Sequence, residues 1–95
     1  MKQLNYKEQL QLARNSGIDP IELYIAEEVD TMAVYTTEQE FEAVCALVRD
    51  TYMDTTNDCI YYCARAITSL FSKYSAKELW EMSTWERLDL YEEEF

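Results

Sequence analysis

The residues of this chain that could do chemistry are its three cysteines and its many carboxylates, because the sequence contains no histidine. Without histidine, Ser-His-Asp and Cys-His nucleophilic systems and His-ligated metal sites are excluded. The single glycine, Gly17, also excludes a glycine-rich phosphate-binding loop. Two carboxylates could still act as acid and base, but they need a cleft, which a helical chain of 95 residues rarely encloses. The sequence therefore predicts a binding protein and not an enzyme.

The cysteines indicate free thiols. Cys59 and Cys63 lie one helical turn apart, and as metal ligands they would need two more soft ligands, of which only Cys45 is present. An odd number of cysteines, without the spacing of a disulfide framework, favours a reducing compartment. We therefore expect Cys63 in the core and Cys59 at its margin, with no metal, cofactor or structural disulfide.

Asp50, Asp54 and Asp58 recur every four residues, which raises the possibility of a calcium site. A calcium-binding loop of the EF-hand kind needs oxygen ligands at alternate positions and a glycine at its sharp turn, and neither is present. We interpret these residues as a helix end, a loop and the first turn of the next helix, where the helix dipole favours acids.

Charge is the strongest feature of the sequence, with a net value of −11. Between Asp19 and Asp58 there are eleven acidic residues and one basic residue, Arg49. Such a charge repels nucleic acid and anionic membranes, because phosphate binding depends on Lys and Arg. The longest apolar run, residues 43–48, is far shorter than a membrane span, and the polar first 15 residues do not resemble a signal peptide. The sequence predicts a cytoplasmic protein that contacts neither nucleic acid nor membrane directly.

Helices must position these groups, because cap residues followed three positions later by an acid recur along the chain. The pairs are Asn5–Glu8, Asp19–Glu22, Thr37–Glu40, Thr55–Asp58, Ser75–Glu78 and Ser83–Glu86. They predict helices near 6–16, 20–35, 38–53, 56–74, 76–82 and 84–94, with Gly17 in the left-handed conformation that closes the first. The predicted fold is an all-α, compact single-domain bundle of about five to six short helices over residues 1–95.

Apolar residues at helical spacing predict the core faces of three of these helices. The stripes are Phe41, Val44, Cys45, Val48 and Tyr52; Ile60, Cys63, Ala64, Ile67, Leu70, Phe71 and Tyr74; and Trp85, Leu88, Tyr91 and Phe95. The terminal glutamates, residues 92–94, are expected to fray.

The acidic residues in the middle of the chain are the candidate partner-binding site. Glu38 and Glu42 share a helix face one turn apart, and like charges at this spacing cost a few tenths of a kcal/mol, so helix stability does not explain them. The predicted site comprises Glu22, Glu27, Asp30, Glu38, Glu40, Glu42, Asp54 and Asp58. The alternative interpretation is an acidic surface that only keeps the protein in solution.

These features predict a small acidic protein whose partner is a basic protein, such as a nuclease or another nucleic-acid-binding protein. In size and charge, though in no motif, the chain is similar to anti-CRISPR and anti-restriction proteins of phages and mobile elements, which occupy nucleic-acid grooves of host nucleases. In such an inhibitor, a DNA mimic, carboxylates stand in for phosphates. The alternative is a helical assembly module or homodimeric accessory protein that binds through its C-terminal aromatic residues, Trp80, Trp85, Tyr91 and Phe95.

Overall fold

The computed structural model describes residues 20–32, 37–55 and 59–94, together with Glu8, Leu12, residues 15–17 and Tyr35. The elements in this part of the chain are α-helices, and they confirm the predicted all-α fold. They are α2 (Pro20–Met32), α3 (Glu38–Asp54), α4 (Ile60–Phe71), α5 (Ala76–Glu81) and α6 (Thr84–Glu94).

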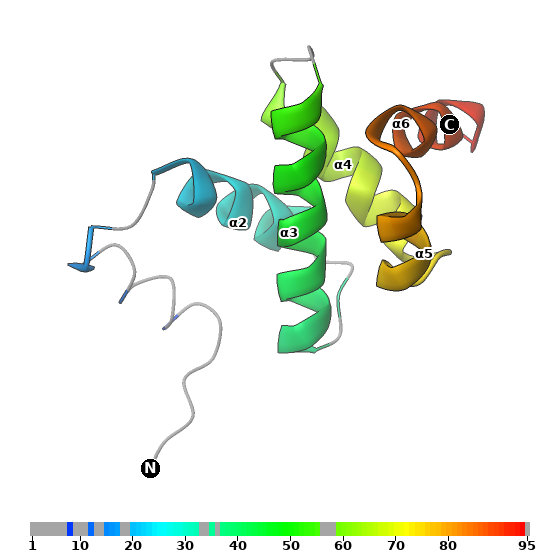
Figure 1. The fold of residues 1–95 in the computed structure, drawn as a ribbon. Coiled ribbons are helices and arrows are strands. Elements are labelled where there is room, and N and C mark those ends of the chain that lie inside the picture. Colours follow the sequence, from blue (N-terminus) through cyan, green and yellow to red (C-terminus); the bar gives the residue numbers. More distant parts are fainter. Residues whose placement is uncertain are drawn as a thin grey trace.

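Helices α3 and α4 form the centre of the bundle, and each contacts all the other described helices. They cross one another, with α2 on one side and the short helices α5 and α6 on the other (Figure 1). Because α3 lies between the two sides, its side chains can contact α2 on one flank and α5 and α6 on the opposite flank.

The hydrophobic core joins α2, α3, α4 and α5. Two of the predicted stripes face it, since Phe41, Val44 and Val48 of α3 and the stripe of α4 from Ile60 to Leu70 are buried. Leu47 of α3 is also buried, although the predicted stripe omits it. A wider stripe is expected for α3 because this helix is covered on more than one side.

Three of the predicted helix starts are confirmed by hydrogen bonds. The Oγ1 atom of Thr37 accepts from the backbone N–H of Glu40 at 3.1 Å, which begins α3. Ser75 and Glu78 form both halves of a capping box at the start of α5. The Oγ atom of Ser83 accepts from the N–H of Glu86 at 3.2 Å in the first turn of α6. Each bond satisfies a backbone donor that the helix leaves without a partner.

The predicted start of α4 is wrong. Thr55 does not cap this helix, because it is the extended C-cap residue of α3. The N-cap residue is Cys59, whose Sγ atom accepts from the N–H of Tyr62 at 3.3 Å. The helix ends at Phe71 instead of residue 74, and the N–H of Lys73 bonds to the carbonyl of Leu70 three residues earlier, in place of the helical bond four residues back.

The second helix, Pro20–Met32, does not extend to residue 35, where the predicted helix ends. Tyr35 lies outside it and packs edge-on against Phe41, with ring centroids 4.2 Å apart. Residues 34–37 include three β-branched side chains, which disfavour continuation of a helix. Gly17 has a φ of 77°, the left-handed conformation that the sequence predicts. The predicted helix 6–16 and the caps at Asn5 and Asp19 lie largely outside the described residues.

The predicted core face of the last helix is partly wrong. Leu88 is buried and Tyr91 is half-buried, but Trp85 is 53 % exposed, whereas Thr84 and Arg87 are buried. Phe95 lies outside the described residues. The expectation of a frayed end is also wrong, because α6 continues to Glu94. Its last turns are tied to α4 and the following loop by hydrogen bonds from Tyr62 to Glu92 and from Lys73 to Glu94, both of 2.8 Å.

Candidate partner-binding surface

Glu22 and Glu42 are the predicted site residues that the fold brings together. Both line a hollow of about 220 Å³ between α2 and α3, whose wall also includes Ile25 and Cys45. Arg49 lines the same hollow, and its Nη1 atom lies 2.6 Å from Oε1 of Glu22. Arg49 is the single basic residue between Asp19 and Asp58, and its charge is thus already neutralised by Glu22.

Glu38, Glu42 and Asp54 carry negative charge that nothing in the described part of the chain compensates. Their carboxylates form no ion pair or hydrogen bond with any other described residue. Glu42 and Asp54 are exposed and Glu38 is half-buried. With a rise of 1.5 Å per residue, they span about 24 Å along one helix. These three residues are the part of the predicted site that is most available to a partner.

The remaining residues of the predicted site are not shown to lie with Glu22, Glu42 or the other uncompensated acids of α3. Glu40 lines a different and larger hollow, of about 600 Å³, between the start of α3 and the α4–α5 connection. Glu27 and Asp30 lie on a flank of α2 that does not line the hollow of Glu22. Asp30 accepts a hydrogen bond of 2.5 Å from the hydroxyl of Tyr35. Asp58 lies outside the described residues. The eight acids are therefore distributed over several surfaces.

Burial, together with the hydrogen bond to Asp30, raises the pKa of Tyr35 to about 12. The same two causes raise the pKa of Tyr62, which donates to Glu92, to about 12. In both pairs the phenol keeps its proton at neutral pH and donates it to a carboxylate. These hydrogen bonds hold the carboxylates of Asp30 and Glu92 in place on the fold.

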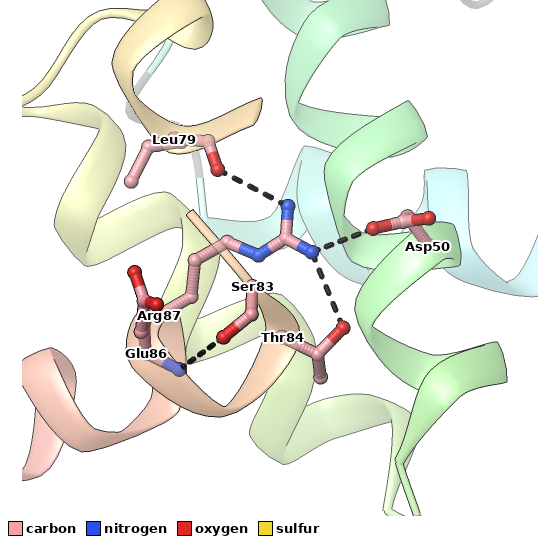
Figure 2. Close-up of polar contacts among 6 residues, drawn as sticks. All are labelled: Asp50, Leu79, Ser83, Thr84, Glu86 and Arg87. Atoms are coloured by element: carbon pink, nitrogen blue, oxygen red, sulfur yellow. Dashed lines mark hydrogen bonds and ion pairs between the residues drawn. The ribbon is translucent and has the colours of Figure 1, made fainter. Parts of the chain in front are cut away.

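A buried arginine, which the sequence did not indicate, joins α6 to α3 (Figure 2). Arg87 is 2 % exposed, and its Nη2 atom donates to Oδ2 of Asp50 at 2.6 Å and to Oγ1 of Thr84 at 3.3 Å. Its Nη1 atom donates to the carbonyl of Leu79 at 3.3 Å, and the ring of Trp80 lies 5.9 Å from its Cζ. A helical wheel of α6 would have indicated this burial, because it places Arg87 beside Thr84 on the side of the helix that faces the core and places Trp85 at the edge of that side.

Two tryptophans near the C-terminus are exposed, as the alternative hypothesis of an assembly module or homodimer requires. Trp80 is 45 % exposed and Trp85 53 %. Trp80 and Met53, which is 65 % exposed, line a hollow of about 350 Å³ between α3 and α5. Tyr91, by contrast, is half-buried and packs edge-on against Tyr62.

Cys45, Cys59 and Cys63 form no disulfide, and they differ in burial. Cys63 lies in the core, as predicted, and burial raises the pKa of its thiol to about 11. Cys59 is exposed at the start of α4, and Cys45 is half-buried. The described residues contain no cluster of three or more Cys, Asp or Glu side chains that could hold a metal ion. A protonated, buried thiol is a poor nucleophile, so Cys63 acts as a small apolar core residue.

None of the helices described combines the length and the apolar character that a membrane span needs. No protein-family model, curated protein or solved structure matches this chain.

Proposed function

We propose that this protein binds a basic surface of another protein, and that the acidic residues of α3 make the main contacts. The observation that carries the proposal is the set of uncompensated carboxylates of Glu38, Glu42 and Asp54 along one helix. Residues 20–55 contain nine acids and one base, Arg49, and that base is paired with Glu22. A partner that supplies Lys and Arg would offset this concentration of charge through charge-assisted hydrogen bonds.

We propose further that the basic surface of the partner is one that normally holds nucleic acid. Carboxylates arranged along a rigid helix can occupy positions that phosphates otherwise fill, and the complex then excludes the nucleic acid. The protein would act as an inhibitor by occupancy, without catalysis, in the manner of small acidic proteins carried by phages and mobile elements. Cysteines that form no disulfide agree with a reducing, cytoplasmic setting.

A second candidate function is supported by the exposed rings of Trp80 and Trp85. Large apolar side chains on the surface of a small domain can mark an interface between proteins. In this case the chain would be a helical assembly module or a homodimer, and association would depend on apolar contact and not on charge.

An affinity capture at two salt concentrations separates the two functions. The immobilised protein would be used to capture partners at about 0.1 M and about 1 M salt, over which the Debye length falls from about 10 Å to about 3 Å. Electrostatic binding should be lost at high salt, and duplex DNA or RNA added at low salt should displace the captured protein. Retention at high salt without displacement by nucleic acid would contradict the proposed function and favour apolar assembly.

A further inference from the structure

The outer face of α3 lies open between two hollows, one against α2 and one against α5; we call this surface the groove. Glu42, Ala46, Arg49 and Met53 are all exposed, and they recur at intervals of three and four residues along this outer face. Ala46 and Arg49 line both the hollow against α2, of about 220 Å³, and the hollow against α5, of about 350 Å³. The two hollows therefore flank the same turns of α3, and the small side chain of Ala46 lies between them.

The two ends of this groove differ in chemistry. Glu42, whose carboxylate has no partner among the described residues, lies toward the start of α3. Met53 and Trp80, which are 65 % and 45 % exposed, line the hollow against α5 together with Arg49 and Asp50, whose charges are already paired with Glu22 and Arg87. A ligand that fits both ends must carry positive charge at one position and an apolar side chain about three turns of helix away.

We propose that this groove binds a basic amphipathic helix of a partner protein. Its Lys or Arg side chains contact Glu42, and one of its apolar side chains enters the hollow of Met53 and Trp80. Ala46 allows the backbones to approach closely, since the distance between packed helices depends on the side chains at the contact. The inference rests on the proposed function, because both require a basic partner.

Charge decides against a second copy of this chain as the occupant. Residues 20–55, which include α2 and α3, contain nine acids against one base, and the whole chain carries a net charge of −11. Two such surfaces repel one another, whereas a basic helix is attracted and oriented by the same field.

The test uses a synthetic probe of defined chemistry. The probe is a peptide of the length of α3, with leucines at helical spacing and lysines elsewhere; a second peptide has the same composition in shuffled order. Binding is measured by fluorescence anisotropy. The ordered peptide should bind more tightly than the shuffled one, because both carry the same charge but only the first presents an apolar stripe.

Variants of the groove then locate the contact. Ala46→Gln, which fills the floor with an uncharged side chain, and Met53→Ala should each weaken the ordered peptide about tenfold. Tyr61→Ala is the matched control, because Tyr61 is 49 % exposed on α4 and lines neither hollow. Arg49→Gln should strengthen binding about two- to fivefold, since it removes the only cation among the described residues that line the groove and releases Glu22. Trp80 is not varied, because its ring also covers Arg87.

The outcomes distinguish binding of a helix in the groove from the proposed function, which is binding of a basic surface by the acids of α3. Loss of binding in the Ala46 and Met53 variants, with normal binding in the Tyr61 variant, supports the groove. Equal binding of the ordered and shuffled peptides, or unchanged binding in both groove variants, overturns it. If the groove proposal fails in this way but reversal of Glu38, Glu42 and Asp54 to Lys still abolishes partner binding, the proposed function stands and the partner binds the acids of α3 without using the groove. Self-association of the chain through this face would also overturn the proposal.

Discussion

Nη2 of Arg87 lies 2.6 Å from Oδ2 of Asp50, and this ion pair connects the last helix to the middle of α3 (Figure 2). The guanidinium is almost completely buried, whereas the side chain of Asp50 is 35 % exposed. Thr84 and the carbonyl of Leu79 satisfy further donors of the same group. The pair therefore holds α5 and α6 against the flank of α3, and it withdraws Asp50 from the acidic residues of α3 that are proposed to contact a partner.

Removal of Asp50 should destabilise the protein far more than removal of a surface acid. Asp50→Ala leaves a buried guanidinium without its counterion, and we expect a loss of about 2 kcal/mol in the free energy of unfolding. Glu22→Ala is the control, because both side chains of the Glu22–Arg49 pair are more than 40 % exposed, and it should cost less than about 1 kcal/mol. Urea unfolding measures both values, and similar losses would contradict a structural role for Arg87.

The buried faces of α3 and α4 give a second prediction. Val48 and Ile67 are completely buried in the core, so Val48→Asp and Ile67→Asp should each unfold the protein or nearly so. An unpaired buried carboxylate costs several kcal/mol, against a total stability of about 5–15 kcal/mol. Gln39→Asp places the same group at an exposed position of α3 and should keep the native circular dichroism spectrum. Cooperative melting in both core variants at the wild-type temperature would show that the core is assigned to the wrong residues.

The fold should lose stability in alkaline solution because of Tyr35 and Tyr62. Their pKa is raised from 10.0 to about 12 in the folded protein, so above pH 10 the unfolded chain releases protons that the folded chain retains. The free energy of unfolding therefore falls as the pH rises from about 10 to about 12. The double variant Tyr35→Phe, Tyr62→Phe should show a shallower decline of melting temperature over this range. An identical slope in the double variant would exclude these phenols as the cause.

The fold could be predicted from the sequence where local signals determine it. The caps at Thr37, Ser75 and Ser83 were predicted correctly because a cap bond joins residues only three positions apart. The start of α4 was not, because Thr55 and Cys59 both stand near a helix end and sequence preference strongly favours threonine as the cap. The choice between them depends on where α3 ends, and α3 continues to Asp54.

The candidate site was predictable only in part, for a related reason. The acids of α3 follow directly from helical spacing, and Glu38 and Glu42 do lie one turn apart on the same helix. The ion pair of Asp50 with Arg87 joins residues 37 positions apart, and it depends on how α6 packs against α3. Likewise, no local pattern indicates that Arg49 pairs with Glu22 or that Glu40 lines a hollow apart from Glu42.

The proposed function predicts that the position of the acids matters more than their number. Reversal of Glu38, Glu42 and Asp54 to Lys should abolish partner binding and leave helicity intact, because these carboxylates have no partners in the described structure. The helix dipole disfavours Lys at the start of α3 and favours it at the end, by about 0.3–1 kcal/mol in each case, so the effects on stability nearly cancel.

The matched control is the reversal of Glu81, Asp89 and Glu93, three exposed acids of α5 and α6 that alter the net charge by the same amount. Glu92 and Glu94 are unsuitable, since both hold α6 in place through Tyr62 and Lys73. Net charge governs the rate of encounter, whereas specific contacts govern the lifetime of a complex. Surface plasmon resonance should therefore show a slower association for the control and no complex for the α3 variant. Equal losses in both variants would mean that only total charge matters, and normal binding in both would direct attention to Trp80 and Trp85.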